Sequence, residues 1–222
     1  MQGCDALATA RLRQWGGARN RADRESWHVS KHQANGLIQA ADNAERLGLR
    51  FNRHWTVHYE RAGIAEEGGA KFIGHLLRLA KAQARRDGGD MAAAWARENG
   101  EGKGGHVHIM MHLPAATYLR NRTRRWIVAA GGKYQAKVSK VVSFAGRLDR
   151  ADMSSDPFVN GLYRANADAV LAYLLKYVEA DVGVALGLSR FGESGRIVGK
   201  RCGWTQNIGR ACSSHAERAS KI

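Results

Sequence analysis

The order of hydrophobic and polar residues predicts that helices and strands alternate along the chain. Ser30-Lys-His-Gln33 has the form of a capping box, and the helix it begins should run to about Leu47, with Gly48 as its end. Elsewhere, hydrophobic positions at helical spacing predict helices, and runs of β-branched and aromatic residues predict strands. The expected helices cover residues 30–47, 69–86, 116–129 and 166–180, and the expected strands cover 51–60, 106–113 and 137–144.

Residues 91–98 fit two kinds of secondary structure. Their alanines favour a helix. The Gly-rich turn at 99–105 and the strand that begins at His106 favour one arm of a β-hairpin instead. In such a hairpin, Glu98 would lie opposite the histidines of the following strand.

The chain has 222 residues, which suits one domain with additional terminal segments. Residues 1–29 are polar and rich in Arg and Gly, which predicts a basic N-terminal arm. Residues 183–222 are basic and Gly-rich, which predicts a C-terminal tail. The domain itself should therefore cover residues 30–182.

Charge is the strongest feature of the composition. The chain has 35 Lys and Arg against 20 Asp and Glu, a formal net charge of +15, which favours a polyanionic partner. Nucleic acid is favoured over a membrane, because no stretch approaches the roughly 18 apolar residues of a membrane-spanning helix. Met1 to Arg13 also lacks the hydrophobic core of a secretory signal.

The three cysteines, Cys4, Cys202 and Cys212, are too few for a disulfide framework, so we expect a reducing, cytoplasmic compartment. A zinc site formed by Cys202, Cys212 and His215 is an alternative use of these residues. It lacks a C-x-x-C pair and a clear fourth ligand.

A pair of histidines offers two ligands for a metal ion. His106 and His108 flank one valine in a predicted strand, so their side chains share a face, about 6.6 Å apart along the chain. His112 shares that face but lies about 13 Å from His108, too far to join the same ion. The alternative is that His106 and His108 are ordinary, partly buried strand histidines.

Glu98 is the expected third ligand, and Glu101, His58 and Glu60 are its rivals. Two imidazoles and a carboxylate would leave coordination positions open for water and a phosphate oxygen. Mg²⁺ or Mn²⁺ is the expected ion for phosphate chemistry, and Mn²⁺ tolerates imidazole better.

The predicted helix 166–180 has two distinct faces. Leu171, Leu174, Leu175 and Val178 point in one direction and predict the core face. Tyr173, Lys176 and Tyr177 point nearly opposite, either as an ordinary solvated face, as tyrosines packed under a loop, or as a functional face. A lysine one turn from a tyrosine favours the phenolate, and tyrosine is then a credible covalent nucleophile.

Together these motifs resemble the HUH endonuclease superfamily, the rolling-circle replication initiators and their relatives. In that family a His-hydrophobic-His strand binds the metal and a downstream tyrosine attacks DNA. Tyr173-Leu-Leu-Lys176-Tyr177 resembles the two-tyrosine motif of the bacteriophage replication gene A proteins, and it also satisfies the single-tyrosine motif of plasmid and viral Rep proteins. Trp55-Thr56-Val57-His58 stands where the family's first motif strand would be, and the resemblance covers about residues 51–180.

The resemblance implies an α+β fold with a central antiparallel β-sheet, flanking helices and the palm-like arrangement of Rep proteins. It implies a metal on His106, His108 and Glu98, nucleophilic attack by Tyr173 to give a 5′-phosphotyrosine, and charge balance by Lys176. Tyr177 would be either a second nucleophile or a structural neighbour.

The implied partner is single-stranded DNA from an origin or hairpin. Because the chain has no phosphate-binding loop of the Gly-x-x-x-x-Gly-Lys-Ser/Thr type, we expect a host helicase to unwind the duplex. The candidate DNA-binding residues are Arg120, Arg122, Arg124, Arg125, Lys200 and Arg201.

Two alternatives to a replication initiator remain. One is a transposase or conjugative relaxase with the same chemistry. The other is a basic DNA-binding protein without catalysis, whose histidines are structural and whose arginines on 116–129 form a solvated helix face.

Overall fold

A computed structural model of the chain describes residues 23–119, 121–144 and 157–209. Five strands form an antiparallel sheet in the order β5-β2-β4-β3-β7. These strands are β2 (Arg53–Val57), β3 (Ala92–Gly100), β4 (Gly104–His112), β5 (Ser139–Ser143) and β7 (Cys202–Trp204). A separate two-stranded ladder joins β1 (Glu25–Ser26) to β6 (Ile197–Val198).

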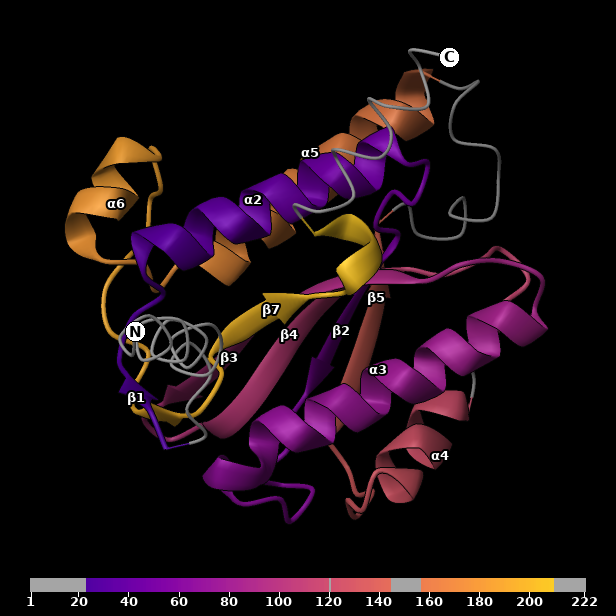
Figure 1. The fold of residues 1–222 in the computed structure, drawn as a ribbon, viewed down its shortest axis with the longest axis horizontal. Coiled ribbons are helices and arrows are strands. Elements are labelled where there is room, and N and C mark those ends of the chain that lie inside the picture. Colours follow the sequence, from indigo (N-terminus) through magenta and orange to yellow (C-terminus); the bar gives the residue numbers. More distant parts are fainter. Residues whose placement is uncertain (1–22, 120, 145–156, 210–222) are drawn as a thin grey trace, which may run out of the picture.

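Helices cover both faces of the sheet, so the protein is an α+β fold, as the sequence predicts (Figure 1). The longer helices α2 (Lys31–Arg46) and α5 (Pro157–Leu175) lie on one face, and α3 (Gly69–Arg86) and α4 (Arg122–Ala129) lie on the other. The short elements are α6 (Ala180–Ala185) and the 3₁₀ helices η2 (Glu66–Gly68) and η4 (Gln206–Ile208). Among the described residues, no helix is both long and apolar enough to cross a membrane.

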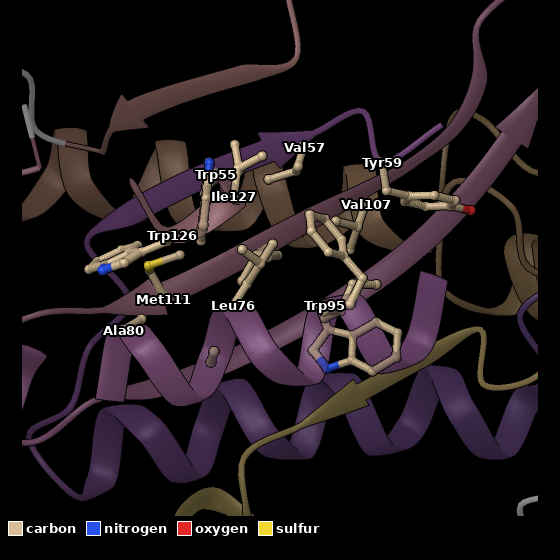
Figure 2. Close-up of a cluster of buried hydrophobic side chains, with 14 of the residues drawn as sticks. Trp55, Val57, Tyr59, Leu76, Ala80, Trp95, Val107, Met111, Trp126 and Ile127 are labelled. Carbon is tan, nitrogen blue, oxygen red and sulfur yellow. The ribbon is translucent and has the colours of Figure 1, made fainter. Parts of the chain in front are cut away.

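Alternation along β4 divides its side chains between two hydrophobic cores. Val107, Ile109 and Met111 pack against α3 and α4. Figure 2 shows this cluster, in which Trp55 of β2 lies beside Trp126 of α4 with ring centroids 5.8 Å apart. The alternate residues of β4, which include the two histidines of the metal-binding motif, therefore face α2 and α5.

Local sequence signals place several elements correctly. The capping box forms, with Ser30 Oγ accepting from Gln33 N at 3.4 Å and Ser30 N donating to Gln33 Oε1 at 2.9 Å. Gly48 ends the helix with a φ of +70°, a conformation that glycine adopts without strain. The helix over 69–86 and the hairpin arm over 91–98 are also confirmed.

Two helix predictions are wrong at their ends. The helix expected over 116–129 begins only at Arg122, after Asn121 in the left-handed conformation with a φ of +61°. The helix expected over 166–180 begins earlier, at Pro157, and ends at Leu175. Beyond Leu175, the Tyr177 carbonyl accepts a hydrogen bond from Val29 N at 2.8 Å, outside the hydrogen-bond pattern of a helix.

The prediction of a tail after residue 182 is also wrong for residues 183–209. Strand β7 pairs with β3 at the edge of the main sheet, and Ile208 is fully buried. At the other end, Val29 is buried and β1 pairs with β6, so the last residues of the expected N-terminal arm belong to the fold. Residues 1–22 and 210–222 of the expected arm and tail lie outside the described residues.

Candidate metal centre and adjoining tyrosines

The β3–β4 hairpin brings the predicted metal ligands together. Glu98 pairs directly with His106 across the ladder, and His108 follows two residues later on the same face. All three side chains are buried, and one ligand atom from each lies within 4.8 Å of the others. The group could therefore hold a metal ion.

The interatomic distances fit a cation between the three side chains. Glu98 Oε2 lies 3.1 Å from His106 Nε2, and Glu98 Oε1 lies 3.5 Å from His108 Nε2. His106 Nδ1 lies 2.9 Å from the Gly104 carbonyl, which can only accept, so in the neutral ring Nε2 has its lone pair toward Glu98. A lone pair and a carboxylate oxygen in contact require a proton or a metal ion between them.

Unsatisfied buried atoms provide a second sign of fit. Among the described residues, Glu98 Oε1 and His108 Nε2 are both buried and have no hydrogen-bond partner. Burying polar atoms without partners is costly, and such atoms in a native fold call for an explanation such as an ion. Both atoms are potential ligands, and they face one another.

Electrostatics keep the carboxylate ionised. Burial alone would raise the pKa of Glu98, but the neighbouring His106 and His108 rings and the positive charge of Lys176 hold it well below the usual value of 4.5. Burial lowers the pKa of His108, and burial together with the nearby His108 lowers that of His54 to about 4. A neutral imidazole at His108 beside the ionised carboxylate of Glu98 is the protonation state that metal binding requires of these two ligands.

Lys176 and Tyr173 adjoin this group from the end of α5. Lys176 Nζ lies 2.9 Å from Glu98 Oε2, and the same nitrogen lies 3.2 Å from the centroid of the Tyr173 ring and 4.9 Å from that of Tyr177. The Tyr173 ring meets the His108 ring edge-on at 4.7 Å. Tyr173 lies in the last turn of α5, whereas Lys176 and Tyr177 lie just beyond it, so the three do not share one helical face as expected.

The expectation that a lysine favours the phenolate is not met at Tyr173. Burial and the negative charge of Glu98 raise the pKa of Tyr173, although Lys103 and Arg190 oppose the shift. Burial likewise raises the pKa of Tyr177, against the positive charge of Lys176. At neutral pH both side chains are therefore phenols.

The rival ligands lie outside the group of three. Glu60 Oε2 accepts a hydrogen bond from Gly105 N at 2.5 Å, and Glu101 is exposed in the hairpin turn. The His58 ring stacks on that of His106, with centroids 4.8 Å apart. Of the residues in the zinc alternative, Cys202 is buried, and Cys212 and His215 lie outside the described residues.

The predicted DNA-binding residues are scattered. Arg122, Arg124 and Arg125 belong to α4, on the opposite face of the sheet from Glu98, and Arg120 lies outside the described residues. Lys200 is exposed, with its Nζ 5.5 Å from the centroid of a Trp95 ring.

Arg201 cannot serve as a surface contact, because it is 1% exposed. Its guanidinium donates to Ser26 Oγ at 2.9 Å, to the Gly195 carbonyl at 2.9 Å and to Ser194. These bonds join the N-terminal strand to the segment before β7, so Arg201 has a structural role.

Comparisons with protein-family models, with curated proteins and with solved structures find no match to this chain. The site must therefore be interpreted from its own chemistry. One neighbour of the metal centre was not identified from the sequence. This residue is His54 on β2, whose Nε2 lies 3.1 Å from His108 Nδ1. The alternation His54-x-Thr56-x-His58 was the available signal, because it puts three polar side chains on one strand face.

Proposed function

We propose that this protein is an HUH-type endonuclease that nicks and rejoins single-stranded DNA, acting as a rolling-circle replication initiator. The observation that carries the proposal is the position of Tyr173. Its ring lies 4.7 Å from that of His108, although the two residues come from different parts of the chain. A tyrosine, a lysine and a two-histidine, one-carboxylate group within contact distance form the set of groups that this chemistry needs.

The α+β architecture is consistent with the palm-like fold of that superfamily. The histidines lie on β4, at the centre of an antiparallel sheet with β2 on one side and β3 on the other. The proposed nucleophile approaches from α5, which covers the same face of the sheet (Figure 1).

His106, His108 and Glu98 would hold a Mg²⁺ or Mn²⁺ ion, which when bound would polarise the scissile phosphate. Tyr173 begins as a phenol, and its oxygen bonds to phosphorus as its proton is lost to solvent. The bond from phosphorus to the 3′-oxygen breaks, and that oxygen takes up a proton to become a free 3′-hydroxyl. The DNA on the other side of the break stays on Tyr173 through its 5′-phosphate, and attack by a 3′-hydroxyl reverses the step.

Lys176 would provide the charge balance. Its ammonium group contacts Glu98 and both tyrosine rings, so it can neutralise a phosphate attached to either side chain. The centroid of the Tyr177 ring lies 4.9 Å from Lys176 Nζ, against 3.2 Å for the Tyr173 ring, and among the described residues only Tyr173 of the two has a ring contact with His108. We therefore propose Tyr173 as the first nucleophile and Tyr177 as a candidate for a second cleavage.

Positive charge near the site suits a DNA strand. The positive charges of Lys103 and Arg190 oppose the rise in the pKa of Tyr173, and the positive charge of Lys140 on β5 contributes to lowering the pKa of His54. These exposed residues are better placed to contact the scissile strand than the arginines of α4. We propose the cytoplasm as the compartment and a host helicase as the partner that exposes the single strand.

The test is the formation of a covalent protein–DNA adduct. Single-stranded oligonucleotides that tile the replicon encoding the protein would be incubated with Mn²⁺ and resolved under denaturing conditions. A 3′-label should move to the protein and a 5′-label to a shorter free fragment, because the proposed linkage is to the 5′-phosphate.

The adduct should be lost in Tyr173→Phe and in His106→Ala, and on addition of a metal chelator. Retention in Tyr177→Phe would assign the first cleavage to Tyr173. Tight binding with no adduct in any lane would instead favour a basic DNA-binding protein without catalysis.

A further inference from the structure

His54 of β2 lies directly behind one of the proposed metal ligands. Its Nε2 is 3.1 Å from His108 Nδ1, and Thr56 Oγ1 is also 3.1 Å from that same nitrogen. The ladder explains this convergence, because Thr56 pairs with His108 and His54 pairs with the next residue on the same face, Met110. The nitrogen of His108 that points away from Glu98 therefore has two possible partners.

Metal binding through His108 Nε2 requires one particular tautomer. A neutral imidazole has one N–H and one lone pair, so a lone pair on Nε2 places the proton on Nδ1. The Nδ1–H group then needs an acceptor. If Nδ1 accepted a hydrogen bond instead, the proton would sit on Nε2, facing Glu98, and would block coordination.

Thr56 and His54 differ in the tautomer of His108 that each one allows. A threonine hydroxyl can donate or accept, so Thr56 allows either tautomer of His108. A neutral His54 with its proton on Nδ1 can only accept at Nε2. That nitrogen selects the tautomer of His108 that coordinates a metal.

We propose that His54 is a positioning residue of the metal centre: it accepts the Nδ1 proton of His108 and so directs the His108 Nε2 lone pair at the ion. The inference deepens the proposed function, because it concerns the same metal centre. His54 is not itself a ligand, since it approaches the far side of the His108 ring and does not belong to the group of ligand atoms within 4.8 Å of one another. Loss of a partner of this kind commonly weakens metal binding by about 10- to 100-fold.

The experiment measures Mn²⁺ affinity by titration calorimetry on the full chain, without DNA. His54→Leu should bind Mn²⁺ at least about tenfold more weakly than the wild type. His54→Gln should stay within about threefold, because its amide oxygen can accept the same proton. His54→Asn, whose shorter side chain does not reach, should behave like His54→Leu.

His112→Leu is the matched control. It removes another histidine from the same face of β4, one that contacts the Arg50 carbonyl rather than the metal centre. Its Mn²⁺ affinity should equal that of the wild type.

Nitrogen-15 NMR of the imidazole rings, recorded without metal, tests the tautomer itself. His108 should carry its proton on Nδ1 in the wild type and in His54→Gln, and should lose that preference in His54→Asn. A purely structural role for His54 would not move this signal.

The outcomes separate the inference from the proposed function. A wild type that binds no Mn²⁺ would overturn the metal centre and the endonuclease proposal with it. A wild type that binds Mn²⁺ while His54→Leu and His54→Asn bind it equally well would overturn only the role of His54. Equal weakening in His54→Gln and His54→Leu would also overturn it, since the acceptor would then be irrelevant.

Discussion

Lys176 Nζ lies 2.9 Å from Glu98 Oε2, so the residue just beyond α5 forms an ion pair with the hairpin that carries the metal-binding histidines. Both side chains are largely buried, 11% exposed for Lys176 and 4% for Glu98. This contact fixes the end of α5 against the sheet and brings Tyr173 to His108.

Lys176→Met should therefore destabilise the metal-free protein, because it leaves a buried carboxylate without its cation. Breaking a buried pair from one side costs about 3–5 kcal/mol. Urea unfolding followed by circular dichroism measures the loss. Lys140→Met, an exposed lysine on β5, is the control and should change the free energy of unfolding by less than about 0.5 kcal/mol.

Mn²⁺ should restore much of the stability lost in Lys176→Met, because an ion bound to the folded state supplies the missing charge and adds its own binding free energy. The melting temperature of this variant should rise more with Mn²⁺ than that of the wild type. An equal rise in both proteins would mean that the ion and Lys176 do not share Glu98.

Two glutamates of one hairpin should differ sharply in metal binding. Glu98→Ala removes a buried carboxylate that faces both histidines, whereas Glu101→Ala removes an exposed one in the turn. Calorimetry with Mn²⁺ should show a loss of about a hundredfold or more for Glu98→Ala, at least as large as that for an outer-shell partner. Glu101→Ala should bind like the wild type, and a comparable loss there would assign the third ligand to the turn.

The metal group was predictable from the sequence because its geometry is local. A short turn fixes the register of the hairpin, and a period of two residues fixes which side chains share a face. The pairing of Glu98 with His106 follows from these two rules. The capping box at Ser30 was predictable for the same reason, since every atom in it belongs to one turn of chain.

Features that depend on distant contacts were not predictable in this way. Just after the end of α5, the Tyr177 carbonyl accepts a hydrogen bond from the backbone N–H of Val29, a residue distant from it in the sequence. The role of His54 needs the pairing of β2 with β4, which no pattern within either strand reveals. Strand β7 is only Cys202–Trp204, too short and too glycine-rich to show alternation.

Cys202 of β7 should be protected from thiol reagents in the folded protein. The side chain is 3% exposed, and burial raises its pKa to about 12, so its thiolate fraction at pH 8 is roughly a thousandfold below that of a free cysteine. In a Cys4→Ser, Cys212→Ser variant, Cys202 is the only thiol, and its labelling at pH 8 should be far slower in buffer than in urea. Equally fast labelling in both would place β7 outside the stable fold.

A pair of helical glycines tests how tightly β7 and its flanking residues pack on the domain. Gly36 lies in α2 with the Trp204 ring where a Cβ atom would be, whereas Gly74 lies in α3 with nothing within 4 Å of that position. Replacing glycine by alanine inside a helix favours the helix by roughly 0.5–1 kcal/mol when nothing obstructs the methyl group. Gly74→Ala should therefore raise the free energy of unfolding by about that amount.

Gly36→Ala should lower it instead, because the displacement of a packed ring costs about 1–3 kcal/mol and exceeds the helix-forming gain. Gly36→Ala combined with Trp204→Leu should recover part of the loss, since a smaller side chain leaves room for the methyl group. Urea unfolding of the four proteins measures both effects. If Gly36→Ala stabilised the protein as much as Gly74→Ala, Trp204 would not be packed against α2, and the segment after residue 183 would be the loose tail that its composition suggests.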